Sequence, residues 1–192
     1  MNKALIHLIL IIFLSACSVI ETPDPFQIQQ AELHVDRGSI YLELNDLQRA
    51  EAEFGLALEI APLAAAMDGL GCVTMMKGDF KEAEKLFQKA HEMDISYHHS
   101  LANLALLYEI QGDKRKAQEF YEEEIGLELM DYRARNNYAA LRYDLFEDLD
   151  EAQGLMLQAQ AINTHPLIQD NLSVLEGIRA KRKNKSEVLK EK

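Results

Sequence analysis

The chain has 192 residues, 48% of them hydrophobic, which is enough to bury the core of one ordinary domain and excludes a largely disordered protein. Its 32 acidic residues outnumber the 20 lysines and arginines, so the net charge is −12 at neutral pH. A chain this acidic repels phosphate backbones, which excludes nucleic acid as a main partner.

Residues 1–16 have the pattern of a secretory signal peptide. Lys3 precedes an apolar run over residues 4–14 that only His7 interrupts, and this run is too short to span a bilayer. The run leads into the tetrapeptide LSAC, which ends at Cys17 and resembles the lipobox of bacterial lipoproteins. The resemblance implies cleavage before Cys17 and a covalent lipid on its sulfur. An ordinary secretory signal with a chance cysteine is the alternative.

The segment that follows is expected to tether the protein to a membrane. A lipid on Cys17 leaves Cys72 as the one thiol, so no disulfide is expected within the mature chain and packing alone must hold the fold. In lipoproteins of the enterobacterial type, aspartate after the cysteine favours the inner membrane, and Ser18 stands there instead. The predicted location is the periplasmic face of an outer membrane. Residues 17–30 are predicted to be the lipidated cysteine followed by a spacer. The spacer is inferred from the two prolines of this segment.

Residues 31–178 repeat a pattern with a period of about 34 residues. Each repeat has an aspartate after a turn. Three further residues follow the aspartate at four, eight and eleven positions, a spacing typical of one face of an α-helix. The aspartates are Asp46, Asp79, Asp113 and Asp148, and the three following columns are Ala50, Ala83, Ala117 and Ala152, then Phe54, Phe87, Tyr121 and Met156, then Ala57, Ala90, Glu124 and Ala159.

A second column of small residues lies upstream of each turn. Its members are Gly38, Gly71, Ala105, Ala139 and Ser173, spaced 33 or 34 residues apart. Small residues let two antiparallel helices approach closely, while the large residue of the second helix fills the space beside them. After His165-Pro166, a further helix over about residues 167–183 is predicted to cap the open end of the array.

These columns resemble the tetratricopeptide repeat family. The resemblance covers residues 31–178 and implies an all-α solenoid of antiparallel helix pairs, with about four repeats plus a C-terminal capping helix. The sequence departs from the family pattern at Arg37 and Glu124, and Ile95 replaces the repeat-ending proline that Pro62 supplies in the first repeat.

In this family the first helix of each pair lines a concave side that holds an extended peptide or a helix. Mapped by periodicity, the predicted partner-binding groove consists of Val35, Ser39, Leu42, Asp68, Cys72, Met75, Asn103, Leu106, Glu109, Asn136, Asn137, Tyr143 and Asn171. Its wall is apolar and its rims are mostly acidic. A protein partner with apolar anchors and basic flanks is therefore expected.

Three asparagines of the groove, Asn103, Asn137 and Asn171, stand 34 residues apart. One interpretation is a ladder of amides that bonds to the backbone of an extended peptide. The other is that asparagine at this place supports the packing of helices. The sequence does not separate the two.

The search for catalytic and metal-binding residues gives a negative prediction. His98 and His99 have no nearby cysteine or further histidine at a metal-ligand spacing, and the run Glu122–Glu124 is predicted to be a solvated face. Phosphate loops and hydrolase motifs are missing from the sequence. We expect neither enzymatic activity nor a metal, and no cofactor beyond the covalent lipid on Cys17.

Charge is distributed unevenly along the chain. Residues 179–192 form a basic tail with a net charge of +5, whereas residues 17–178 carry −18. The tail is interpreted as a solvated helix end, and docking on an acidic partner or phospholipid is the alternative.

The lipobox together with the repeats resembles the assembly lipoproteins of pilus and secretion machines, in particular the tight-adherence (Flp) pilus TadD type and the type IV pilus pilotins. The segments 134–139 and 169–173 carry paired helices with asparagines that look like those of that family. The resemblance implies a scaffold that holds a secretin or another assembly component. An adaptor for envelope proteases or peptidoglycan enzymes, of the NlpI type, is the alternative.

Overall fold

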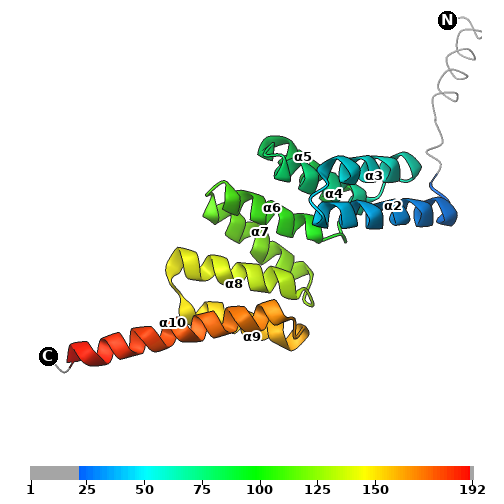
Figure 1. The fold of residues 1–192 in the computed structure, drawn as a ribbon. Helices are drawn as coiled ribbons and strands as arrows, with labels where there is room; N and C mark the ends of the chain where they lie inside the picture. The colour runs from blue at the N-terminus through cyan, green and yellow to red at the C-terminus, as the bar shows by residue number, and fades with distance from the viewer. Residues whose placement is uncertain (1–21, 191–192) are drawn as a thin grey trace, which may run out of the picture.

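The computed structural model describes residues 22–190, which form nine α-helices and no β-strand. The all-α prediction is confirmed for this part of the chain. The helices are α2 (Pro25–Glu43), α3 (Leu47–Ile60), α4 (Ala64–Met76), α5 (Phe80–Met93), α6 (His99–Ile110), α7 (Lys114–Leu127), α8 (Tyr132–Phe146), α9 (Leu149–Ile162) and α10 (Pro166–Lys190). They follow one another along an elongated stack with α2 and α10 at opposite ends (Figure 1).

The stack is built of helix pairs that contact only their neighbours. Helices α2 and α3, α4 and α5, α6 and α7, and α8 and α9 form four hairpins, and α10 packs on α9. Helix α4 also contacts both α2 and α6, whereas no two of α3, α5, α7 and α9 are in substantial contact within residues 22–190. We therefore call α2, α4, α6, α8 and α10 the inner helices and the other four the outer helices. This is the predicted solenoid of four repeats and one extra helix.

The repeated aspartates explain where each outer helix begins. Each aspartate side chain accepts a hydrogen bond of 3.0–3.2 Å from the backbone N–H three residues later, which caps the helix. The turn residue just before each aspartate has a positive φ. In two repeats this residue is a glycine, Gly78 (86°) or Gly112 (82°), which adopts such a conformation without strain.

The small residues of the inner helices let the aromatic rings of the outer helices pack against bare backbone. A Cβ atom at Gly38 would lie 2.7 Å from Cε1 of Phe54, and one at Gly71 would lie 2.5 Å from Cε1 of Phe87. Both rings are buried. The predicted pairing of small and large residues between the two helices of a repeat is thus confirmed in the first two repeats.

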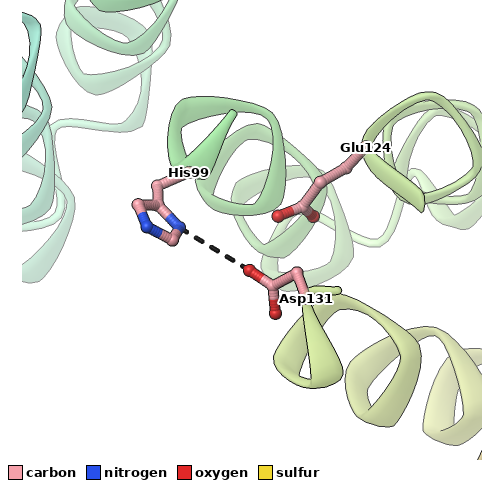
Figure 2. Close-up of side chains that lie close together, drawn as sticks. All are labelled: His99, Glu124 and Asp131. Atoms are coloured by element: carbon pink, nitrogen blue, oxygen red, sulfur yellow. Dashed lines mark ion pairs between the residues drawn. The ribbon is translucent and has the colours of Figure 1, made fainter. Parts of the chain in front are cut away.

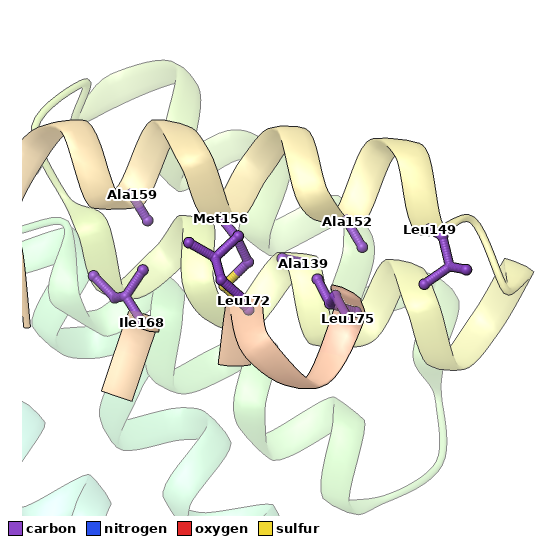
Figure 3. Packing of buried hydrophobic residues seen from close by; sticks show 8 residues of the cluster. All are labelled: Ala139, Leu149, Ala152, Met156, Ala159, Ile168, Leu172 and Leu175. Atoms are coloured by element: carbon purple, nitrogen blue, oxygen red, sulfur yellow. The ribbon is translucent and has the colours of Figure 1, made fainter. Parts of the chain in front are cut away.

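Helix α10 closes the C-terminal end of the apolar core. Its residues Ile168, Leu172 and Leu175 are buried against α9, where they meet Met156 and neighbouring side chains (Figure 3). The prediction that this helix caps the stack is confirmed.

The first helix begins earlier than expected. Residues 25–30, predicted to be spacer, belong to α2, so that prediction is wrong for them. Asp24 and Gln27 form a capping box, with Asp24 Oδ1 accepting from Gln27 N at 2.8 Å and Gln27 Oε1 accepting from Asp24 N at 3.0 Å. Pro25 therefore starts the helix, because a proline in the first turn gives up no hydrogen bond.

The last helix also extends further, since it continues to Lys190 rather than ending near Lys183. The start of the predicted basic tail is docked on α9. Arg179 pairs with Asp150 at 2.5 Å between Nη2 and Oδ1, and Arg182 pairs with Glu147 at 2.7 Å between Nη2 and Oε2. Both arginine side chains remain nearly half exposed, so the interpretation of a solvated helix end holds for them, and their ion pairs also hold α10 beside Glu147 and the start of α9.

Cys17 and the predicted signal peptide lie outside the described residues. Among residues 22–190, none of the helices combines the length and apolar character that crossing a bilayer requires.

Candidate functional site

The residues predicted to form the groove all lie on inner helices. Val35, Ser39 and Leu42 lie on α2, Asp68, Cys72 and Met75 on α4, Asn103, Leu106 and Glu109 on α6, Asn136, Asn137 and Tyr143 on α8, and Asn171 on α10. Because all of them lie on inner helices, we call this set of residues the inner face. Their role in binding a partner stays a prediction.

The apolar members of the inner face divide into two groups. Val35, Leu42, Cys72, Met75 and Tyr143 are half-buried and pack against the core clusters, so they also support the fold. Leu106 is half-buried as well, but it belongs to none of the core clusters formed by the described residues. Leu106 is therefore the apolar side chain best placed to contact a partner without supporting the core.

The polar centre of the inner face is a buried network around Asp68. This carboxylate is 5% exposed and accepts hydrogen bonds from Asn103 Nδ2, at 3.0 and 2.9 Å, and from the Tyr97 hydroxyl, at 3.2 Å. Burial raises its pKa to about 6 despite these donors. Burial and the nearby Asp68 charge also raise the pKa of the Cys72 thiol, which keeps the thiol protonated and unreactive at neutral pH.

The asparagines join adjacent repeats, as the packing interpretation predicts. Asn103 on α6 donates to Asp68 on α4, and Asn171 on α10 donates to Asn136 on α8 at 2.9 Å. Each pair is separated by 35 residues. Asn137 occupies the equivalent place on α8, but the residue 35 positions before it is Ala102, which offers no side-chain acceptor. Asn137 instead accepts from its neighbour Asn136 at 3.2 Å.

Two hollows lined by residues of the inner helices contain predicted groove residues. One, of about 410 Å³, includes Val35 beside the carboxylates of Glu32, Asp36 and Asp94. The other, of about 330 Å³, includes Asn136 and Asn137 together with Arg133, between α8 and α10. The first hollow is acidic, which matches the expected basic flank of a partner.

Glu124, His99 and Asp131 form a cluster that the sequence pattern does not predict. Glu124 on α7 is fully buried, and neither carboxylate oxygen has a hydrogen-bond partner, so the prediction of a solvated face is wrong for it. Its side chain points toward His99 and Asp131 (Figure 2). One ligand atom from each of the three residues lies within 4.8 Å of the other two, and His99 Nδ1 is 3.7 Å from Asp131 Oδ2.

The electrostatics of this cluster are unfavourable for a buried carboxylate. Burial, and then the negative charge of Asp131, raise the pKa of Glu124 to about 8, while the Arg135 guanidinium opposes the shift. The sequence signal that could have found Glu124 is its position in a column where the other repeats carry alanine. Alanine there packs between helices, so a carboxyl group at that place is buried with it.

Comparisons with known proteins agree with this architecture. Tetratricopeptide repeat models match residues 31–62 and 62–127. Among curated proteins, no sequence matches the chain.

Several solved structures share the fold. PilF of Pseudomonas aeruginosa is 19% identical, with a TM-score of 0.68 over 81% of this chain and 71% of that one. A tetratricopeptide repeat protein from Parabacteroides merdae is 20% identical, with a TM-score of 0.57 over 80% of this chain and 61% of that one. YrrB, described as a tetratricopeptide repeat protein with an unusual peptide-binding site, is 22% identical, with a TM-score of 0.52 over 78% of this chain and 77% of that one.

Proposed function

Because the chain is built from tetratricopeptide repeats, we propose that it is a protein-binding scaffold without catalytic activity of its own. The inner face holds an extended segment or a helix of a partner protein. The observation that carries this proposal is the open stack, in which the inner helices leave side chains such as Leu106 outside the core clusters of the described residues. Helix-in-groove and extended-peptide binding both use such rows of apolar anchors.

The chemistry of the inner face defines the kind of segment that fits it. Leu106 and the edges of Met75 and Tyr143 accept apolar anchors, because these side chains are only half-buried. The hollow beside Val35 adds three carboxylates. The partner segment is therefore amphipathic, with apolar anchors and at least one basic flank.

We further propose that the scaffold is anchored in the outer membrane through a lipid on Cys17, and that it assists the assembly of a tight-adherence or type IV pilus or a related secretion system. Three observations support this role: the lipobox before Cys17, the resemblance of the repeats to pilus assembly lipoproteins, and the shared fold with PilF. The partner is then a secretin or another assembly component.

The experiment is affinity capture from cell envelopes with the wild type and two variants of matched chemistry. Leu106→Glu places a charge on the inner face, whereas Leu157→Glu places the same charge on outer helix α9, where Leu157 is 51% exposed. We expect Leu106→Glu to reduce partner recovery at least tenfold, and Leu157→Glu to leave it unchanged, with equal helicity by circular dichroism.

The result also identifies the class of partner. Recovery of a secretin or pilus component by mass spectrometry supports the assembly role, whereas recovery of proteases or peptidoglycan hydrolases supports the adaptor alternative. Equal loss of recovery in both variants contradicts binding by the inner face. Loss of helicity in Leu106→Glu alone would place Leu106 in the core.

A further inference from the structure

We propose that His99, Glu124 and Asp131 form a binding site for a divalent transition-metal ion of the Zn²⁺ class, which links the third and fourth repeats. This site is independent of the scaffold role proposed above. It lies beside the inner face, where an inner helix, the outer helix of the same repeat and the next inner helix meet.

The three side chains come from three different helix ends. His99 is the first residue of α6, Glu124 lies in the last turn of α7, and Asp131 is the residue that caps α8. Ligand atoms around one zinc ion at 2.0–2.2 Å lie about 3–3.5 Å from each other. The three ligand atoms lie within 4.8 Å of one another here, so binding of the ion would draw them closer together. The His99 side chain is 54% exposed and that of Asp131 only 8%, so His99 has more room than Asp131 to move toward the ion.

Glu124 is the observation that points to a bound cation. Both of its oxygens are buried and lack a hydrogen-bond partner, and the carboxylate points into the cluster (Figure 2). Packing alone does not require this residue, because Ala57, Ala90 and Ala159 fill the same place in the other repeats. A metal ion would satisfy a carboxylate that the protein itself leaves unpaired.

Asp131 keeps one oxygen available for a metal. Its Oδ1 caps α8 by accepting from Arg133 N at 2.6 Å and from Ala134 N at 3.2 Å, and its Oδ2 faces His99. The nearby Arg135 donates to the backbone carbonyls of Glu128 and Asp131. These bonds direct the guanidinium to main-chain oxygens, while the charges of Asp68, Glu128 and Asp131 all disfavour ionised Glu124. A divalent cation between the carboxylates removes this repulsion.

The donor set selects the class of metal. One imidazole nitrogen with two carboxylate oxygens suits zinc, whereas magnesium and calcium prefer oxygen ligands throughout. His99 and Asp131 also line a pocket of about 290 Å³ that is open to solvent. Water or a side chain of a partner can therefore supply the fourth ligand.

The test is calorimetric titration of the full chain, purified in detergent and stripped of metal with a chelator that is then removed. Zinc chloride and magnesium chloride are the titrants. We expect one zinc ion per chain, no magnesium binding, and a higher melting temperature with zinc. His99→Ala and Glu124→Gln should each weaken zinc binding at least tenfold. Asp131→Asn should weaken it too while retaining the helix cap, because asparagine caps helices as well.

His34→Ala is the matched control. His34 faces a single carboxylate, with 2.6 Å between its Nδ1 and Glu53 Oε2. The substitution therefore removes a histidine–carboxylate pair but leaves the three-residue cluster intact. Its zinc binding should equal that of the wild type. The proposal is overturned if the wild type shows no one-to-one zinc binding, if correctly folded His99→Ala or Glu124→Gln binds zinc as tightly as the wild type, or if His34→Ala weakens binding as much as His99→Ala.

Discussion

A single carboxyl group in a position otherwise filled by alanine changes the energetics of the third repeat. Glu124 is as buried as the alanines at its place in the other repeats, but its two oxygens have no hydrogen-bond donor. The folded chain therefore favours the protonated side chain, and the pKa rises to about 8. The unfolded chain has no such preference. The stability of the metal-free protein is thus coupled to pH through this residue.

Glu124→Gln should remove that coupling. As pH rises from about 4.5 to about 8, unfolded Glu124 loses its proton while the folded residue retains it, so the stability of the wild type falls over this window. Melting temperatures in the presence of a chelator should be similar for both proteins at pH 4.5. At pH 8.5 the variant should be more stable by on the order of 2–4 kcal/mol, which raises its melting temperature by several degrees. A difference that does not change with pH would show that Glu124 is not the group that titrates.

At the scale of the helices, close approach between the two members of a pair depends on residues with a small side chain or none. Gly71 of α4 leaves room for the ring of Phe87 from α5, since an added Cβ would lie 2.5 Å from that ring. The ring is fully buried and packs with Leu104 and Leu107 of the next repeat. The same contact therefore joins the two helices of one repeat and the following inner helix.

Gly71→Ala should destabilise the protein by about 1–3 kcal/mol, because the ring of Phe87 must shift within a packed core. Gly55→Ala on α3 is the control, since nothing lies within 4 Å of the added Cβ there. That variant should gain up to about 1 kcal/mol from the better helix propensity of alanine. Urea unfolding measures both. Stabilisation by both substitutions would show that Gly71 is not required for close packing.

What the sequence predicts best is the part that local chemistry determines. The caps at Asp46, Asp79, Asp113 and Asp148 act within three residues, so their period reveals where the outer helices begin. The start of α2 differs from the prediction because the two prolines indicated a spacer, although Asp24 caps the helix and a proline suits its first turn. The cluster of His99, Glu124 and Asp131 was missed because stacking, rather than spacing along the chain, brings these residues together.

At the scale of the whole molecule, the repeat body and the proposed anchor reside in separate segments. The core clusters lie within residues 31–175, and each is formed by neighbouring helices of the stack. Cys17 precedes the first of these residues by 14 positions in the sequence and lies outside the described residues. Loss of the anchor is therefore expected to leave the stack intact.

Cys17→Ser should abolish lipid attachment, so the protein should move from the membrane fraction to the soluble fraction after cell disruption. Its helicity and melting temperature should equal those of the wild type. Cys72→Ser is the matched control, because Cys72 lies on α4 and should not affect anchoring. Retention of Cys17→Ser in the membrane fraction would exclude lipid attachment at this cysteine as the source of anchoring.

The uneven use of asparagine makes the joints between repeats unequal. Hydrogen bonds from Asn103 and Asn171 tie the second repeat to the third and the fourth to the terminal helix, but Ala102 leaves no such bond for Asn137 at the joint between. Apolar packing holds that joint instead, because Tyr138 and Leu141 of α8 share a core cluster with Tyr121 of α7. That joint therefore depends on apolar packing where its two neighbours also have an amide bond, which gives successive repeats chemically different interfaces.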